Sequence, residues 1–189
     1  MLVALLLVVT LACQPPRDLP DFGAAPRFSL TDQSDQPFTS ADTANRVVVV
    51  DFIYTTCTDI CPMLSARMRD LQERLKSENL FASRVLLLSI TVDPQRDTPA
   101  VLAEYGERFH ADPAGWRFLT GDREILRHLL HDGFKVGFPT GAKPRGDDPG
   151  WLHSNRFILI DRAGHVRGYP TLGDRDLDTI LDDVRALLA

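Results

Sequence analysis

The chain has 189 residues, of which 44% are hydrophobic and 25% are charged, and its formal net charge is −5. These values are typical of a globular protein with one sizeable core, and they exclude a disordered or fibrous chain. The acidic balance and the absence of any Lys/Arg run argue against nucleic-acid binding, because phosphates require a basic surface. We therefore expect no nucleic-acid partner.

The N-terminus differs in kind from the rest of the chain. Residues 1–12 (MLVALLLVVTLA) are apolar throughout. They are fewer than the roughly 20 residues that span a bilayer, but they suit the hydrophobic region of a secretory signal peptide. Ala12 before Cys13 resembles the cleavage site of a bacterial lipoprotein signal, which predicts a lipid on Cys13. Two features depart from that signal: no Lys or Arg precedes the apolar run, and Thr10 stands where an aliphatic residue is usual. A plain secretory signal and a short membrane anchor are therefore the alternatives.

Residues 13–26 are rich in Pro, Gly and Ala and show no periodicity, which predicts a flexible tether. Residues 27–189 then form one domain. We expect this domain to lie on the periplasmic, extracytoplasmic face of a bacterial inner membrane, held there through the N-terminus. In such a compartment disulfides can persist, so the state of each cysteine matters.

Hydrophobic patterning predicts the elements of this domain in chain order. A small hairpin at 27–39 precedes a buried β-branched strand at 46–54 and an amphipathic helix at 62–76. The later elements are a buried strand at 84–92, a helix from Thr98 to 110, a short strand at 116–119, a helix at 122–133, strands at 155–160 and 165–169, and a helix at 174–188. Residues 138–150 read as a surface loop.

This order predicts an α/β protein with a thioredoxin-like fold, in which helices flank a central mixed sheet and an N-terminal hairpin is added. The two buried strands each lead into a helix, so they should pair in parallel through right-handed crossovers. Cys57 then lies in the loop after the first central strand, and Cys61 lies at the start of the following helix. Open α/β folds place their functional sites at this carboxyl end of the strands.

Three interpretations of Cys57 and Cys61 are open: a structural disulfide, a redox couple or a metal site. A helix N-terminus favours the thiolate, which is both a redox nucleophile and a metal ligand. A disulfide closing so short a loop would stabilise the fold weakly. The three intervening residues argue against a general thioredoxin-type enzyme, which has two. Structural zinc would require more ligands than the neighbourhood offers.

His153 is the histidine expected to approach the cysteines. It ends the loop before the strand at 155–160, and in thioredoxin-like folds this loop faces the cysteine motif across the site. Two thiolates and an imidazole suit Cu(I) and can also hold Cu(II). The other histidines have simpler interpretations. His110 is a favourable charge at the end of a helix, and His128 and His131 lie on a solvated helix face. His165 lies in an exposed position next to a hairpin turn.

Several separated motifs resemble the Sco/SenC family of copper chaperones for cytochrome c oxidase assembly, over residues 28–189. They are DFIYTTCTDICP (51–62), SITVDPQRDTP (89–99), FLTGD (118–122) and LHSNRFILIDRAG (152–164). Thr58 departs from the family pattern, which has Pro after the first cysteine. We interpret Asp97 and Thr98 as helix-capping residues and Arg96 as an ion-pair former, and none of them as a ligand.

The resemblance implies that Cys57, Cys61 and His153 bind one copper ion, as Cu(I) or Cu(II). It implies delivery to the binuclear copper site of a cytochrome c oxidase subunit, with other copper chaperones or thiol reductases as further partners. We expect a metallochaperone rather than an enzyme with a small-molecule substrate. The alternative is an extracytoplasmic thiol-disulfide oxidoreductase, in which Cys57 attacks and Cys61 resolves. A peroxiredoxin-like peroxidase lacks an identifiable peroxide-activating environment here.

Overall fold

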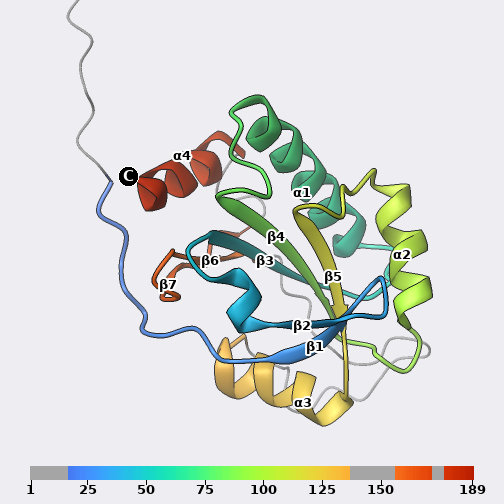
Figure 1. The fold of residues 1–189 in the computed structure, drawn as a ribbon. Helices are drawn as coiled ribbons and strands as arrows, with labels where there is room; N and C mark the ends of the chain where they lie inside the picture. The colour runs from blue at the N-terminus through green and yellow to red at the C-terminus, as the bar shows by residue number, and fades with distance from the viewer. Residues whose placement is uncertain (1–16, 137–155, 172–176) are drawn as a thin grey trace, which may run out of the picture.

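A computed structural model describes residues 17–136, 156–171 and 177–189 (Figure 1). Its centre is a seven-stranded sheet with the strand order β2-β1-β5-β4-β3-β6-β7. The strands are β1 Ser29–Asp32, β2 Pro37–Thr39, β3 Val47–Ile53, β4 Val85–Thr91, β5 Trp116–Thr120, β6 Ile158–Ile160 and β7 Val166–Gly168.

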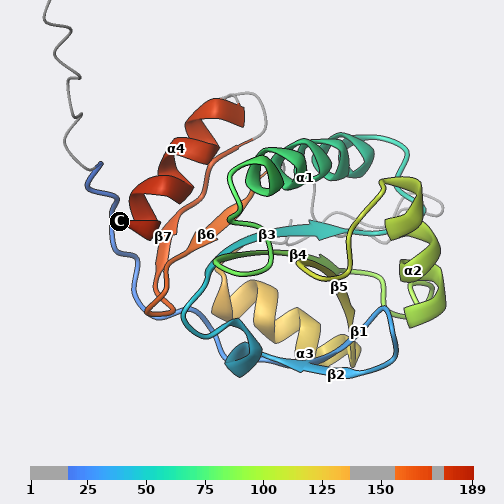
Figure 2. The same cartoon turned by 45° about the horizontal axis from the view of Figure 1, so that its top comes forward.

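Helices cover both faces of this sheet (Figure 2). They are α1 Ile60–Ser77, α2 Pro99–Arg108, α3 Arg123–His128 and α4 Leu177–Leu188. Helices α1 and α4 lie on one face and α3 lies on the other (Figure 2). A hydrogen bond of 2.9 Å between Ser65 Oγ and Tyr105 Oη joins α1 to α2 in the interior. The predicted helix at 122–133 changes after α3 into a π-helical turn, Leu129–Gly133.

The strand pairings confirm the predicted thioredoxin-like α/β architecture. Strands β3 and β4 are parallel, as are β4 and β5, while the hairpins β1–β2 and β6–β7 are antiparallel additions at the two sides. The β3–β4 register runs from Val47 opposite Val85 to Ile53 opposite Thr91. Because the two strands end at the same level, the loops that follow them meet at one edge of the sheet.

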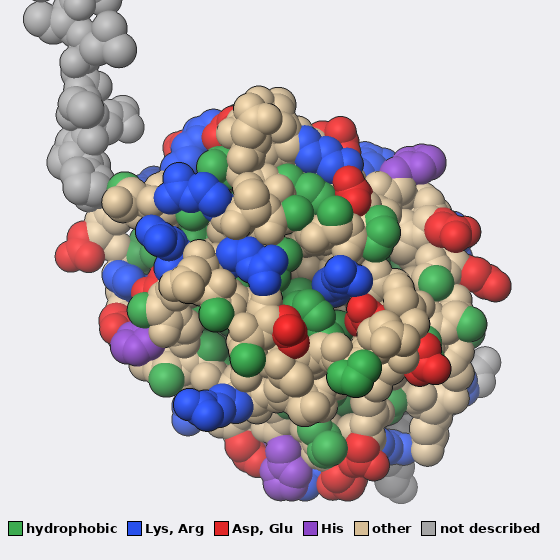
Figure 3. All heavy atoms as spheres, in the orientation of Figure 1, with side chains coloured by type: hydrophobic (Ala, Val, Ile, Leu, Met, Phe, Trp, Pro, Cys, Tyr) green, Lys and Arg blue, Asp and Glu red, His purple; other side chains and the backbone are tan. Residues whose placement is uncertain are grey.

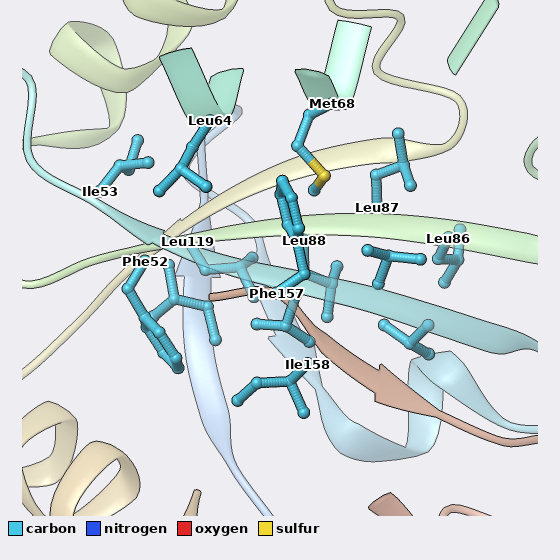
Figure 4. Close-up of a cluster of buried hydrophobic side chains, with 14 of the residues drawn as sticks. Phe52, Ile53, Leu64, Met68, Leu86, Leu87, Leu88, Leu119, Phe157 and Ile158 are labelled. Atoms are coloured by element: carbon cyan, nitrogen blue, oxygen red, sulfur yellow. The ribbon is translucent and has the colours of Figure 1, made fainter. Parts of the chain in front are cut away.

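The core lies between the central strands and the helices. Every residue of β3 and β4 is buried, as their predominantly apolar composition predicts. Leu64 and Met68 point from α1 towards the side chains of these strands (Figure 4). On the opposite face Phe52 meets Phe134, with ring centroids 5.8 Å apart. Since successive strand residues alternate in direction, Asp51 therefore faces the α1 side.

Residues 18–25 run along the edge of β7. The amide of Phe22 donates to the carbonyl of Val166 at 2.9 Å, and the amide of Val166 donates to the carbonyl of Gly23 at 2.9 Å. The rings of Phe22 and Tyr169 meet edge to face. Arg17 forms an ion pair of 2.9 Å with the buried Asp183 of α4. Through these contacts residues 17–25, the described part of the predicted tether, pack against the domain.

On the face seen in Figure 3, acidic and basic side chains are interspersed, in keeping with the small net charge. Within the described residues, no helix is both long enough and apolar enough to cross a membrane. The predicted signal segment 1–12 and Cys13 lie outside those residues.

Candidate metal centre

The loop that carries the first cysteine begins where β3 ends. The amide of Cys57 donates to the carbonyl of Tyr54 at 3.1 Å, which closes a tight turn over Tyr54–Cys57. Helix α1 starts at Ile60, two residues earlier than its sequence period indicated, so Cys61 lies in its first turn. The turn and the helix start bring the two cysteines together, as the sequence predicts.

The sulfur of Cys57 takes the place of a capping group at the start of α1. Asp59 occupies the N-cap position, but its side chain makes no capping hydrogen bond. Instead, the amide of Cys61 donates to Cys57 Sγ at 3.4 Å. The first amides of a helix have no partner within the helix, so this sulfur satisfies one of them. Both cysteines are buried, and neither is in a disulfide.

The two thiols are electrostatically unequal. Burial acts to raise the pKa of Cys57, but hydrogen bonds from the Cys61 thiol, from the amides of Asp59 and Cys61, and from the Tyr54 side chain together lower it. Burial and the neighbouring sulfur of Cys57 raise the pKa of Cys61. Cys57 is therefore the sulfur that ionises first, while Cys61 keeps its proton and donates it in a hydrogen bond.

Asp51 is an ionisable group in the core behind the cysteines. Its side chain is fully buried on β3, opposite Ser89 of β4. Neither of its carboxylate oxygens has a hydrogen-bond partner of normal geometry among the described residues. Burial raises the pKa of Asp51 to about 7, an effect that the nearby Ser89 hydroxyl only partly offsets. Its charge also acts to raise the pKa of Cys61, so it faces the site.

The turn after β4 lies beside the cysteine loop and corrects one prediction. Thr98 caps α2 as expected, accepting a hydrogen bond from the Val101 amide at 3.4 Å. Arg96 pairs with Asp93 at 3.1 Å, also as expected. Asp97 does not cap the helix. Its buried carboxylate instead accepts hydrogen bonds from Thr55, in the loop after β3, because the parallel strands end side by side.

Three histidines of the described region pair with carboxylates away from the cysteines. His128 and His131 both contact the carboxylate of Asp132 at 2.6 Å on the exposed surface, and His165 pairs with Asp21 at 2.8 Å. His153, the predicted third ligand, and the predicted loop 138–150 lie outside the described residues. Within the described part of the chain, no three His, Cys, Asp or Glu side chains are grouped to hold a metal ion.

Comparison with known proteins identifies the family. The model of the family described as SCO1/SenC matches residues 17–189. The chain belongs to the SCO1/SenC family. This SCO1/SenC protein is similar to a SCO1/SenC family lipoprotein from Bacillus anthracis, with 29% identity and a TM-score of 0.77 over 88% of this chain and 96% of that one.

Two other solved structures bear on the chemistry of the SCO1/SenC site. One is BsSco, described as having a disulfide switch and as a member of the Sco family of cytochrome c oxidase assembly proteins. It is 27% identical, with a TM-score of 0.77 over 92% of this chain and 98% of BsSco. The other is yeast Sco1 with copper bound. It is 27% identical, with a TM-score of 0.69 over 86% of this chain and 89% of yeast Sco1.

The chemistry of the two thiols fits copper. Thiolate sulfur is a soft donor that selects Cu(I), and the sulfurs of Cys57 and Cys61 lie together at a helix N-terminus. The lowered pKa of Cys57 makes its sulfur the easier one to ionise, and Cys61 must release its proton when a metal binds. Thr58, which departs from the family pattern, is exposed.

Proposed function

We propose that this SCO1/SenC protein is a copper chaperone that binds one copper ion and delivers it to the binuclear copper site of a cytochrome c oxidase subunit during assembly. The observation that carries the proposal is the pair of buried, free thiols at the start of α1, where the sulfur of Cys57 accepts a hydrogen bond from the amide of Cys61. Family membership and the copper-bound yeast relative support it. Copper is the cargo of this protein, rather than a cofactor for a reaction.

His153 is proposed as the third ligand. In the sequence it lies three residues before Arg156, which forms an isolated bridge with Thr171 beside the sheet. Strand β6 pairs directly with β3, the strand whose loop carries Cys57. A neutral imidazole added to two thiolates gives a donor set that accommodates both Cu(I) and Cu(II).

Metal loading of the reduced protein tests this proposal. The expected result is about one copper per chain, with loss of tight binding in Cys57→Ser, Cys61→Ser and His153→Ala. His131→Ala is the matched control, because His131 is engaged with Asp132 on the surface, and it should leave the stoichiometry unchanged. If His153→Ala binds copper as tightly as the parent yet still reduces a partner disulfide, the chaperone function is refuted.

The second candidate function is thiol-disulfide exchange with the oxidase subunit or other exported proteins. The unequal thiols favour it, because Cys57 ionises first and suits attack on a disulfide. Cys57 would form a mixed disulfide and release one partner thiolate. Cys61 would then attack Cys57, releasing the second partner thiol and leaving the Cys57–Cys61 disulfide. Partner reduction that survives His153→Ala while copper delivery is lost would assign this activity to the thiols alone.

We propose that the protein lies on the extracytoplasmic face of a bacterial inner membrane, tethered through lipidated Cys13. The composition of residues 1–12 supports this, as does the B. anthracis relative, which is described as a lipoprotein. Fractionation of cells that express Cys13→Ser should move the protein from the membrane to the soluble periplasmic fraction. Unchanged membrane association would favour an uncleaved anchor instead.

A further inference from the structure

Asp97 connects two loops that are far apart in sequence and adjacent at the edge of the sheet. Its carboxylate is fully buried and accepts hydrogen bonds from three donors. These are the Thr55 amide at 3.2 and 3.3 Å from its two oxygens, the Thr55 hydroxyl at 2.5 Å and the Thr91 hydroxyl. Asp97 thereby fastens the loop after β3 to the end of β4.

The hydrogen-bond directions around Asp97 require an acceptor at this position. The hydroxyl of Thr91 accepts the amide of Asp93 at 3.0 Å, so its own proton is free to point at Asp97. The Thr55 amide can only donate. Because a carboxylate carries no donor, it satisfies all of these groups at once. An amide of the same shape would turn an NH₂ group towards at least one of them.

The contact with Thr55 reaches the sulfur pair through two further hydrogen bonds. Thr55 is the second residue of the turn that closes between the Tyr54 carbonyl and the Cys57 amide. The sulfur of Cys57 then accepts the amide of Cys61 at the start of α1. A chain of direct contacts thus runs from Asp97 through the turn to both cysteines.

The turn that contains Asp97 does not depend on this carboxylate for its own shape. The amides of Arg96 and Asp97 both donate to the carbonyl of Asp93, at 3.1 and 2.9 Å. Thr98 then caps α2 through its own side chain. The Asp97 side chain is therefore directed away from its own turn and towards the cysteine loop.

We propose that Asp97 is a positioning residue that fixes the Cys57 sulfur over the start of α1 and thereby sets how tightly the cysteine pair retains copper. This inference rests on the proposed copper function for its cargo. Its geometric part, the placement of one sulfur relative to the other, also governs the equilibrium between dithiol and disulfide. That equilibrium can be measured without copper.

The test compares Asp97→Asn with Asp93→Asn. Both variants make the same chemical change in the same turn on a buried carboxylate, but the Asp93 side chain pairs with the half-exposed Arg96 rather than with the cysteine loop. Two quantities are measured: the rate of Cu(I) loss to a chelator, and the equilibrium constant of the Cys57–Cys61 pair in glutathione buffers. Asp97→Asn should change each by about tenfold, the effect of disrupting a hydrogen bond to a charged group, and Asp93→Asn by less than about twofold.

Substitutions of Thr55 keep the test decisive if Asp97→Asn fails to fold. Thr55→Ser retains the hydroxyl and should behave as the parent, whereas Thr55→Val should shift both quantities in the same direction as Asp97→Asn. A lowered melting temperature with both quantities unchanged would overturn the proposal and leave Asp97 a purely structural group. If the parent binds no copper, the copper function fails, while the glutathione equilibrium still decides the role of Asp97.

Discussion

Replacing Asp51 with Asn should remove a large pH-dependent term from the stability of this protein. The folded state raises the pKa of Asp51 from 3.8 to about 7, chiefly because the side chain is fully buried. An acid with a raised pKa in the folded state stabilises the fold only while it is protonated. That stabilisation is complete below about pH 3.8 and is lost as the pH rises through about 7.

The magnitude follows from the difference between the two pKa values. About 3 pH units at about 1.4 kcal/mol each correspond to about 4 kcal/mol lost between the two limits. Between pH 5 and pH 8 the loss should be about 2–3 kcal/mol. Since the Asn side chain does not titrate, the variant lacks this term. Its free energy of unfolding, relative to the parent, should rise by the same amount over this range.

Urea unfolding of the reduced, copper-free protein at several pH values measures this difference. The relevant quantity is the pH dependence of the difference between parent and variant, because a buried amide introduces a constant offset of its own. Asp70→Asn makes the same change on a half-exposed carboxylate and serves as the control variant. Parallel stability curves for the parent and Asp51→Asn would refute the assignment of a buried, titrating carboxylate.

Three further predictions concern the surroundings of the site. Tyr54→Phe removes one of the groups that lower the pKa of Cys57, so the pH midpoint for alkylation of Cys57 in the reduced protein should move upward; an unchanged midpoint would exclude this hydrogen bond. Thr98→Ala removes the cap of α2 and should cost about 1 kcal/mol in chemical unfolding, with Thr98→Ser as the control that retains most of it. Gly115→Ala should destabilise by about 1–3 kcal/mol, because an added Cβ would lie 2.9 Å from the backbone of Ala82; a variant as stable as the parent would show that this backbone yields.

The sequence predicts the order of elements well, because local periodicity and composition dominate in β3, β4 and α1. The parallel pairing and the meeting of Cys57 with Cys61 follow from that order together with the handedness of crossovers. The boundary of α1 was less accurate. Pro62 predicts a helix start, whereas the helix begins at Ile60 and the sulfur of Cys57 replaces a capping side chain.

Asp51 and Asp97 show where local patterns are insufficient. Asp97 binds Thr55, which lies 42 residues away in the sequence, whereas its position beside Thr98 indicates helix capping. Only the parallel register of β3 and β4 brings them together. For Asp51 a signal was present: a single carboxylate inside an apolar strand that reads as buried on both faces must be functional, paired or neutral. His153 lies outside the described residues, so its ligand role stays a prediction.

The N-terminal segment along β7 has a consequence for how the isolated domain behaves. Strand β7 is the last strand of the sheet, and an uncovered edge strand is a template for pairing with other chains. The hydrogen bonds of residues 22–25 with the chain from Gly164 to Val166 occupy part of that edge. A soluble version that begins at residue 27 would therefore expose the edge of β7, which could then pair with the same edge of another copy. The same domain begun at residue 17 would keep its edge covered and should resist aggregation at high concentration.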